Sequence, residues 1–227
     1  MPKDETLSAN RLKPGAEGVS IVLLTGPSGS GKSTLAALLE RRGWDRIDGD
    51  ALAKSLYVPG CPLLRSIAKE FGDFILKSDA SLDAQRLGEI VFPSVTKRKA
   101  LNRLVYPPFL RALRGRLRAA RLGRRPCVAD VAVYFDLGAP RLGIPVVLVQ
   151  APLKLRLARL TAKGLTPARA LARAKALRFG AVERKSATFV IQATATPKNL
   201  MHDFERGLRA CQRPAIPGRH SQSQGRR

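Results

Sequence analysis

The sequence predicts an α/β fold in which a parallel β-sheet is covered by helices on both faces. Short apolar segments rich in β-branched residues recur along the 227 residues and alternate with helical segments, which is the order that parallel sheets require. A glycine-rich loop joins the first apolar segment to the first helical one. With 44% hydrophobic residues, the chain can bury a core without disulfide or metal support.

The first predicted elements are a strand over residues 19–25 and a helix over residues 32–42, which Gly43 ends. Four further apolar segments follow, and we expect strands at 46–48, 127–131, 145–151 and 188–193. Residues 55–120 have a helical pattern that is too long for one crossover helix. We therefore expect a helical insertion there, with breaks at Pro59-Gly60, at Pro93 and at Pro107-Pro108.

The two ends of the chain lack apolar periodicity. We expect a flexible lead-in over residues 1–18, one folded domain over 19–205, and a basic, disordered tail over 206–227. No stretch approaches 18 apolar residues, so no membrane span is predicted. Three scattered cysteines predict neither a disulfide framework nor a zinc site, which fits a cytoplasmic protein.

Positive charge is concentrated in the second part of the chain. The sequence has 41 Lys and Arg against 17 Asp and Glu, a net charge of +24, and the whole excess follows residue 83. Residues 111–125 form one arginine cluster, and residues 154–178 form a basic segment without an acidic residue. A polyphosphate ligand, RNA or an anionic surface would bind to this basic part of the chain. A solvated helix face is the simpler alternative for the first cluster.

The segment from Gly26 to Ser33 fits the pattern G-x-x-x-x-G-K-[ST] between a predicted strand and helix. Such glycines let backbone N–H groups point at a phosphate, and the helix start adds the positive end of its dipole. Lys32 would bridge the β- and γ-phosphates of a nucleotide, and the Ser33 hydroxyl would bind Mg²⁺. A helix-capping turn is the structural alternative. The expected phosphate-binding residues are Gly26, Gly29, Ser30, Gly31, Lys32, Ser33 and Thr34.

Carboxylates follow two of the predicted strands. Asp48 and Asp50 come after the short second strand, and Asp130 ends the segment 127–131. The carboxyl edge of a parallel sheet is where ligands bind in α/β folds. Asp130 is therefore a candidate for the carboxylate near Mg²⁺ in phosphoryl transfer. A helix N-cap or a turn aspartate is the alternative for each aspartate, and this alternative is preferred for Asp50.

These residues resemble the dephospho-CoA kinase family, P-loop enzymes that phosphorylate the 3′-hydroxyl of the dephospho-CoA ribose. The likeness spans about residues 20–200, and the order and spacing of short motifs carry it. The motifs are Thr25 to Thr34, Ile47-Asp48-Gly49-Asp50 with Ala53, Gly60-Cys61-Pro62, Phe71-Gly72, Leu82-Asp83, Leu87 to Phe92, Tyr106-Pro107, Asp130-Val131, Phe135-Asp136, Arg159-Leu160, Arg173 and Val190-Ile191.

The resemblance implies a P-loop kinase core with a five-stranded parallel sheet, residues 55–120 as the helical CoA-binding insertion and residues 152–185 as a basic lid. It implies ATP and Mg²⁺ as cofactors and dephospho-CoA as acceptor, in the last step of coenzyme A biosynthesis. Lys32, Asp48 and Arg159 would then be catalytic. Asp48 would orient the ribose hydroxyl and accept its proton, while Arg159, with Arg173 as second choice, would neutralise charge on the phosphates.

Departures from the family pattern fall mainly on its acceptor and adenine sides, whereas the loop and the carboxylates are intact. Two alternatives therefore stay open. One is a degenerate homologue that binds nucleotide or CoA without turnover. The other, suggested by the net charge, is a nucleic-acid-associated ATPase or RNA-binding protein, whose binding would weaken steeply with salt. The departing residues are Ala84, Tyr106, Ala132, Asp136, Lys163, Leu177, Thr188 and Ala193.

Overall fold

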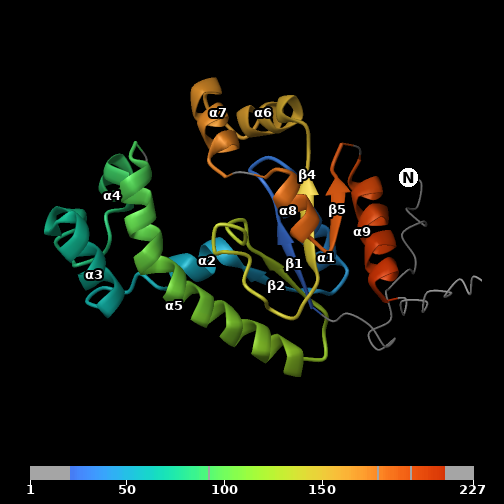
Figure 1. The fold of residues 1–227 in the computed structure, drawn as a ribbon, viewed down its shortest axis with the longest axis horizontal. Helices are drawn as coiled ribbons and strands as arrows, with labels where there is room; N and C mark the ends of the chain where they lie inside the picture. The colour runs from blue at the N-terminus through green and yellow to red at the C-terminus, as the bar shows by residue number, and fades with distance from the viewer. Residues whose placement is uncertain (1–20, 92, 178, 195, 213–227) are drawn as a thin grey trace, which may run out of the picture.

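The computed structural model describes residues 21–212, except residues 92, 178 and 195. Five strands form one sheet with the order β2-β3-β1-β4-β5, and every neighbouring pair is parallel (Figure 1). Each strand lies at a predicted strand segment, which confirms the α/β fold. The strands are β1 (Ile21–Thr25), β2 (Asp45–Asp48), β3 (Cys127–Asp130), β4 (Val146–Gln150) and β5 (Phe189–Gln192).

Helices connect the strands and extend beyond the sheet. The first crossover is α1 (Lys32–Arg41), as predicted from residues 32–42. A short 3₁₀ turn at Asp73–Ile75 lies between α3 and α4. The remaining helices are α2 (Gly49–Lys54), α3 (Pro62–Phe71), α4 (Ala84–Val91), α5 (Val95–Leu122), α6 (Leu153–Thr161), α7 (Pro167–Lys175), α8 (Ala181–Ser186) and α9 (Pro197–Gln212).

Two apolar cores cover the two faces of the sheet. On one face α1 and α9 pack together, and the buried Trp44 meets Phe204 edge-on at a ring distance of 5.7 Å. On the other face lie α2, the second half of α5 and the segment 131–144, with Leu113 fully buried. The carboxyl edge of the sheet stays open between these layers, which is where ligands bind in such folds.

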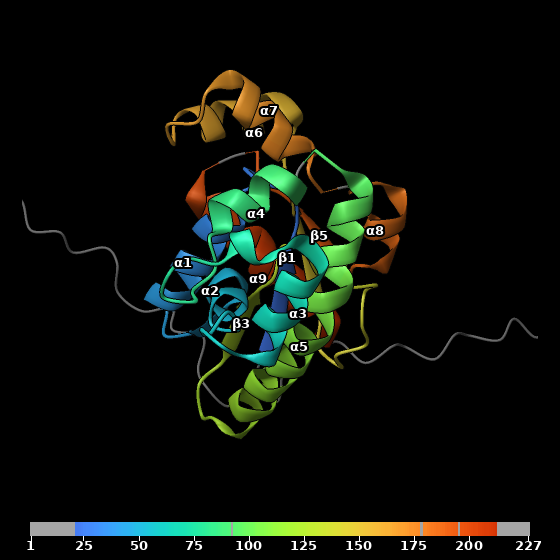
Figure 2. The ribbon, with the colours of Figure 1, turned by 90° about the vertical axis from the view of Figure 1, so that its left-hand side faces the viewer.

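A third cluster stands apart from the sheet. It joins α3, α4 and the first half of α5 through buried residues that include Ile67 and Ile75. Figure 1 shows this helical group projecting from one side of the molecule, and in Figure 2 the same group faces the viewer. It falls within residues 55–120, where the sequence predicts a helical insertion. The predicted break at Pro59-Gly60 precedes α3, and the one at Pro93 lies between α4 and α5.

The predicted break at Pro107-Pro108 is wrong, because α5 runs through both prolines as one helix. A proline inside a helix removes a backbone hydrogen bond and costs about 3 kcal/mol or more. Here the flanking turns are held on both sides, by Val105 in the projecting cluster and by Leu113 in the central core. In Figure 1 the helix changes direction near its middle, as prolines inside helices produce.

The predicted boundary of the tail at residue 206 is also wrong, because residues 206–212 form the end of α9. Leu208 is 6% exposed and packs in the core beside α1. Burial on one helical face therefore orders a segment whose composition is basic and polar. The predicted lead-in over residues 1–18, and residues 213–227 of the predicted tail, lie outside the described residues.

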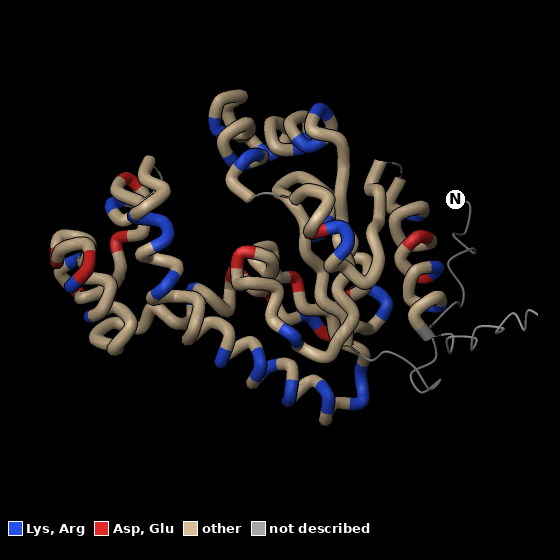
Figure 3. The backbone as a smooth tube through the Cα atoms, in the orientation of Figure 1, with Lys and Arg blue, Asp and Glu red and all other residues tan. Residues whose placement is uncertain are grey.

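The arginine cluster at residues 111–125 lies mostly on the surface. Arg111, Arg114 and Arg118 are exposed along the second half of α5, and Figure 3 shows the basic residues that line this helix and mark α6 and α7. Within the part of the chain that the structure describes, none of the helices combines the length and apolar character needed to cross a bilayer.

Candidate active site

The loop between β1 and α1 is closely surrounded by backbone. Gly26 has a φ of 142°, and a Cβ there would lie 2.1 Å from the carbonyl oxygen of Val149. Gly29 has a φ of 78°, and its Cβ would lie 2.7 Å from the carbonyl oxygen of Arg156. Only glycine fits both the left-handed backbone and the space. The loop predicted to bind phosphate is thus packed between β4 and α6.

Lys32, the first residue of α1, points back into this loop. Its Nζ donates to the carbonyl oxygens of Gly26 at 2.6 Å and Pro27 at 3.3 Å, and the residue is 8% exposed. Burial lowers the pKa of Lys32, and the negative charges of Asp130 and Asp50 oppose this effect. The ammonium group lies at the loop that its predicted role requires.

The loop also holds a buried polar atom without a partner. Within the described residues, the Ser30 hydroxyl is buried and makes no hydrogen bond. Such a group costs free energy unless something satisfies it. Ser33 and Thr34, in the first turn of α1, are exposed and accessible to a ligand. An unsatisfied hydroxyl and exposed side chains at a helix start suit an anionic ligand.

Asp48 and Asp130 lie side by side at the carboxyl edge of the sheet, where the register pairs them across β2 and β3. Arg46 lies between their side chains: its Nη2 is 2.9 Å from Oδ2 of Asp130 and 3.5 Å from Oδ2 of Asp48. Burial raises the pKa of Asp130, while Lys32 and Arg46 act to lower it. The sequence indicated both aspartates but not the arginine that neutralises them.

The N-cap role expected for Asp50 belongs to Asp48, the last residue of β2. Asp48 is the N-cap of α2, and its Oδ1 accepts hydrogen bonds from the backbone N–H groups of Asp50 at 2.9 Å and Ala51 at 3.0 Å. The preference for Asp50 as the cap is therefore wrong. Asp50 lies in the first turn of α2 and lines a cavity. The other carboxylate oxygen of Asp48, Oδ2, faces Arg46.

Arg159 supports the phosphate loop from the side of α6. Its Nη1 lies 3.3 Å and 3.2 Å from the carbonyl oxygens of Gly29 and Ser30, and its Nη2 donates to the carbonyl oxygen of Ala193 at 2.8 Å. The guanidinium is thus at the loop, as predicted. These contacts tie the loop to the end of β5, a supporting task that the sequence did not reveal.

Arg156 is a second loop-binding arginine that the prediction missed. Its Nε donates to the carbonyl oxygen of Ser28 at 2.9 Å, and its Nη2 donates to the carbonyl oxygen of Ala174 in α7. Burial lowers the pKa of Arg156. It belongs to the basic segment 154–178, but nothing local in the sequence distinguishes it from its neighbours.

Arg173, the predicted second choice, is placed differently. It lies on α7 with an exposed side chain and makes no hydrogen bond or ion pair to the described residues. The structure therefore brings Arg156 and Arg159, but not Arg173, into contact with the loop. The sequence could not make this distinction, because all three arginines occupy similar positions on basic helices.

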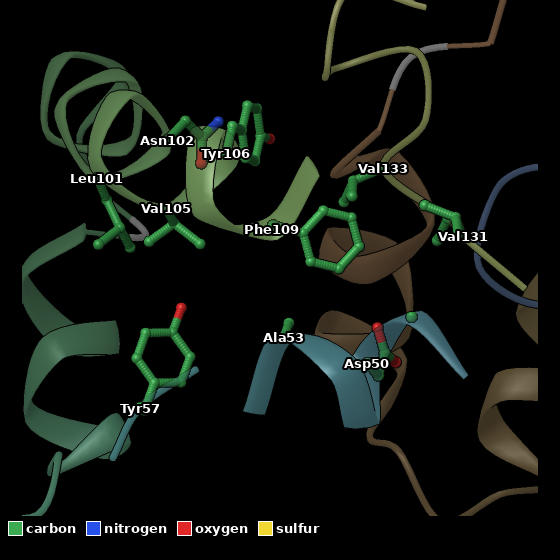
Figure 4. A pocket seen from close by; sticks show the side chains of 12 residues that line it. Asp50, Ala53, Tyr57, Leu101, Asn102, Val105, Tyr106, Phe109, Val131 and Val133 are labelled. Atoms are coloured by element: carbon green, nitrogen blue, oxygen red, sulfur yellow. The ribbon is translucent and has the colours of Figure 1, made fainter. Parts of the chain in front are cut away.

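A cavity of about 210 Å³ opens beside the two aspartates, between α2, α5 and residues 131–133; we call it the α2–α5 cavity (Figure 4). Asp50 and Ala53 line it from α2, while Tyr106 and Phe109 line it from α5. Its other lining residues are Gly49, Tyr57, Leu101, Asn102, Val105, Val131, Ala132 and Val133. Aromatic and apolar walls with a few polar groups are typical of small-molecule sites.

Tyr106 is the polar group of this cavity that departs from the family pattern. Burial and the nearby charge of Asp136 raise the pKa of Tyr106 to about 12, although a hydrogen bond with Asn102 acts to lower it. The phenol therefore stays protonated near neutral pH and can donate a hydrogen bond. Two further departing residues, Ala132 and Leu177, also line cavities.

The donors near the loop fit a hard divalent cation better than zinc. No group of three or more His, Cys, Asp or Glu gathers anywhere among the described residues. Mg²⁺ usually takes only one or two protein oxygens and completes its octahedron with water and substrate phosphates. The exposed Ser33 hydroxyl and the Asp130 carboxylate supply such oxygens beside the loop. The donor set is compatible with the predicted metal.

Comparison with known proteins gives consistent matches. A family model described as dephospho-CoA kinase matches residues 20–198. A dephospho-CoA kinase of Symbiobacterium thermophilum is 39% identical over 155 residues, which is 67% of this chain and 65% of that protein. The chain therefore spans just under two thirds of that relative. A dephospho-CoA kinase of Anaeromyxobacter dehalogenans is 35% identical over 83% of this chain and 90% of its own length.

The fold is matched among solved structures as well. A dephospho-CoA kinase from Campylobacter jejuni superposes with a TM-score of 0.63 at 21% identity, covering 85% of this chain and 98% of that one. At this identity the match supports the P-loop kinase architecture alone. The family model, however, covers most of the chain, and it includes the glycine loop and both aspartates. The chain belongs to the dephospho-CoA kinase family.

Proposed function

We propose that this protein transfers the γ-phosphoryl group of ATP to the 3′-hydroxyl of dephospho-CoA, the last step of coenzyme A biosynthesis. The observation that carries the proposal is the position of Asp48 and Asp130, paired across neighbouring strands beside the loop that holds Lys32. The α2–α5 cavity opens at the same edge and offers room for an acceptor. Family membership supplies the identity of that acceptor.

The loop residues bind and orient the nucleotide. Backbone N–H groups of residues 29–34 and the start of α1 would surround the phosphates, and the Ser30 hydroxyl would gain the partner that it lacks. Lys32 would exchange its bonds to loop carbonyls for phosphate oxygens. Arg156 and Arg159 hold the loop carbonyls away from the phosphates, which keeps the N–H groups directed inward.

Asp48 would receive the acceptor. Its Oδ1 is committed to the N-cap of α2, so Oδ2 is the oxygen left to orient the ribose hydroxyl and accept its proton. The N-cap fixes the carboxylate, because rotation would break two backbone hydrogen bonds. Preorganisation of this kind is the main protein contribution in phosphoryl transfer.

The metal is part of the proposal. Ser33 and Asp130 would hold Mg²⁺, which when bound neutralises charge on the transferring phosphates. We also propose a cytoplasmic location. The three cysteines, Cys61, Cys127 and Cys211, are all free, which is the usual state in a reducing compartment.

The test is a transfer assay with the purified protein, ATP, Mg²⁺ and dephospho-CoA, in which the product is identified by mass spectrometry and ³¹P NMR. We expect a 3′-phosphorylated product, and we expect its formation to stop on chelation with EDTA and to return with added Mg²⁺. Phosphorylation of another small alcohol in place of dephospho-CoA would refute the acceptor assignment. ATP binding without transfer to any acceptor would identify a degenerate homologue.

A further inference from the structure

A second cavity, of about 300 Å³, lies at the carboxyl ends of β4 and β5; we call it the α8 cavity. Gln150 and Gln192 line it from these two strands, and Arg184 lines it from α8. Pro27 of the phosphate loop and Arg156 of α6 complete the wall nearest the nucleotide site.

Gln150 indicates that the occupant is polar. Its side chain is buried, with 8% of the residue exposed, and within the described residues its amide makes no hydrogen bond. Gln150 borders the cavity, and its carboxamide can both donate a hydrogen bond to a ligand there and accept one from it.

The charge of the lining indicates an anion. Arg156 and Arg184 contribute two guanidinium groups, and no acidic residue lines the cavity. Arg156 is already bonded to the carbonyl oxygens of Ser28 and Ala174. Arg184 is exposed and, among the described residues, its guanidinium group has neither a hydrogen bond nor an ion pair. Guanidinium and carboxamide groups together suit phosphate oxygens.

The α8 cavity and the α2–α5 cavity are neighbours. Phe135, in the segment that follows β3, meets Phe179 of the α8 cavity edge-on at a ring distance of 5.9 Å. The next residue, Asp136, interacts electrostatically with Tyr106 of the α2–α5 cavity and with Glu183 of α8. Residues 135–136 therefore lie near the walls of both cavities, and we expect one extended ligand to reach from one cavity to the other.

We propose that the α8 cavity binds the diphosphate of dephospho-CoA, with Arg184 and Gln150 as its specificity-determining residues. This inference rests on the proposed function. Dephospho-CoA carries its charge only in the diphosphate, which joins a neutral adenosine to a neutral pantetheine arm. The apolar, aromatic α2–α5 cavity fits a neutral part, and the α8 cavity fits the charged one. The phosphates of ATP have the backbone amides of the loop as their own site.

The decisive experiment compares Arg184→Ala with Lys185→Ala, a matched control one residue further along α8 that is exposed and lines neither cavity. Steady-state kinetics would give KM for dephospho-CoA and for ATP, and the inhibition constant of adenosine competing with dephospho-CoA. For Arg184→Ala we expect KM for dephospho-CoA to rise about tenfold or more, as for one lost charged hydrogen bond. KM for ATP and the inhibition constant of adenosine, which lacks the diphosphate, should stay within about twofold.

A second variant separates ligand binding from packing. Gln150→Leu removes the carboxamide at similar volume, so we expect a nearly unchanged melting temperature together with a raised KM for dephospho-CoA. A purely structural residue would not change KM in this way. If Arg184→Ala raises KM for ATP and KM for dephospho-CoA equally, the cavity belongs to the nucleotide site. If it changes neither KM, the cavity does not bind dephospho-CoA. Either result overturns the inference. If the unmodified protein does not phosphorylate dephospho-CoA at all, the proposed function fails, and this inference fails with it.

Discussion

Arg46 donates from Nη2 to Oδ2 of Asp130 at 2.9 Å, although 84 positions separate the two residues. Arg46 lies on β2 and Asp130 ends β3, so the pairing of these strands creates the contact. The Asp130 side chain is 11% exposed, and a buried carboxylate needs a cation or hydrogen bonds to remain charged. Arg46 thereby reduces the electrostatic repulsion between the adjacent carboxylates of Asp48 and Asp130.

Arg46→Met should destabilise the fold and slow transfer. Removing one partner of a buried charged hydrogen bond costs about 2 kcal/mol, and Asp130 and Asp48 would then repel each other. Urea unfolding and turnover number are the measurements. Arg125→Met is the control, because it breaks an exposed pair with Asp45 at the start of β2 and should cost less than about 1 kcal/mol.

The pH dependence of this loss has a definite sign. Burial already raises the pKa of Asp130, and Arg46 opposes that rise, so the pKa should climb further in Arg46→Met. A protonated Asp130 needs no cation. The stability difference between the variant and the unmodified protein should therefore be largest near neutral pH and shrink as the pH falls through the raised pKa. A difference that is constant over the acid range would contradict this account.

Lys32→Ala should abolish transfer and leave the fold intact. The ammonium group bonds only to loop carbonyls in the structure, while its predicted partner is phosphate. Loss of one preorganised charge at a transition state typically lowers turnover about 10²–10³-fold, so we expect at most a trace of transfer. The assay is single-turnover transfer, with circular dichroism to follow the fold. Near-normal turnover in this variant would be incompatible with the assigned role of the loop.

Asp48→Asn should spare ATP affinity and lower turnover sharply. Asparagine is as good an N-cap as aspartate, so α2 should keep its start, while the group that accepts the proton is lost. Calorimetric titration with ATP and measurement of the turnover number separate the two effects. Asp48→Ala is the comparison: it should lose the cap as well, at about 1 kcal/mol of stability. Equal losses of ATP affinity and turnover in Asp48→Asn would instead indicate a metal-binding role.

Tyr106→Phe should weaken the binding of the acceptor and leave the binding of the nucleotide unchanged. The phenol lines the α2–α5 cavity, and one hydrogen bond of about 1 kcal/mol corresponds to a roughly fivefold rise in KM for dephospho-CoA. Because the pKa of Tyr106 is about 12, the phenol remains a donor below that pH, and KM in the unmodified protein should show no phenol ionisation between about pH 6 and 10.

A buried tyrosine outside the cavities provides the control for this experiment. Tyr134 donates to the carbonyl oxygen of Pro140 at 3.2 Å and lines neither cavity. Tyr134→Phe should therefore lower the melting temperature slightly and leave both KM values unchanged. If KM for ATP rose as much as KM for dephospho-CoA in Tyr106→Phe, the tyrosine would not be specific to acceptor binding.

Local signals in the sequence were sufficient for much of this protein. The five strands appear as short apolar segments, and the phosphate loop is a run of consecutive residues whose glycines fix its backbone. The positions of Asp48 and Asp130 followed from strand ends, because parallel strands share one carboxyl edge. These features depend on neighbours in the chain, so they can be read without a tertiary structure.

Burial and contacts between distant residues were decided only by the tertiary structure. Pro107 and Pro108 suggested a break, yet packing at both ends of α5 keeps one helix. Among similar arginines, only those whose helix packs against the loop reach it, as Arg156 does across 128 positions to Ser28. The α8 cavity likewise depends on where α8 lies against the ends of β4 and β5. Such contacts follow from strand register and helix packing, because these set which side chains meet, and no local pattern encodes them.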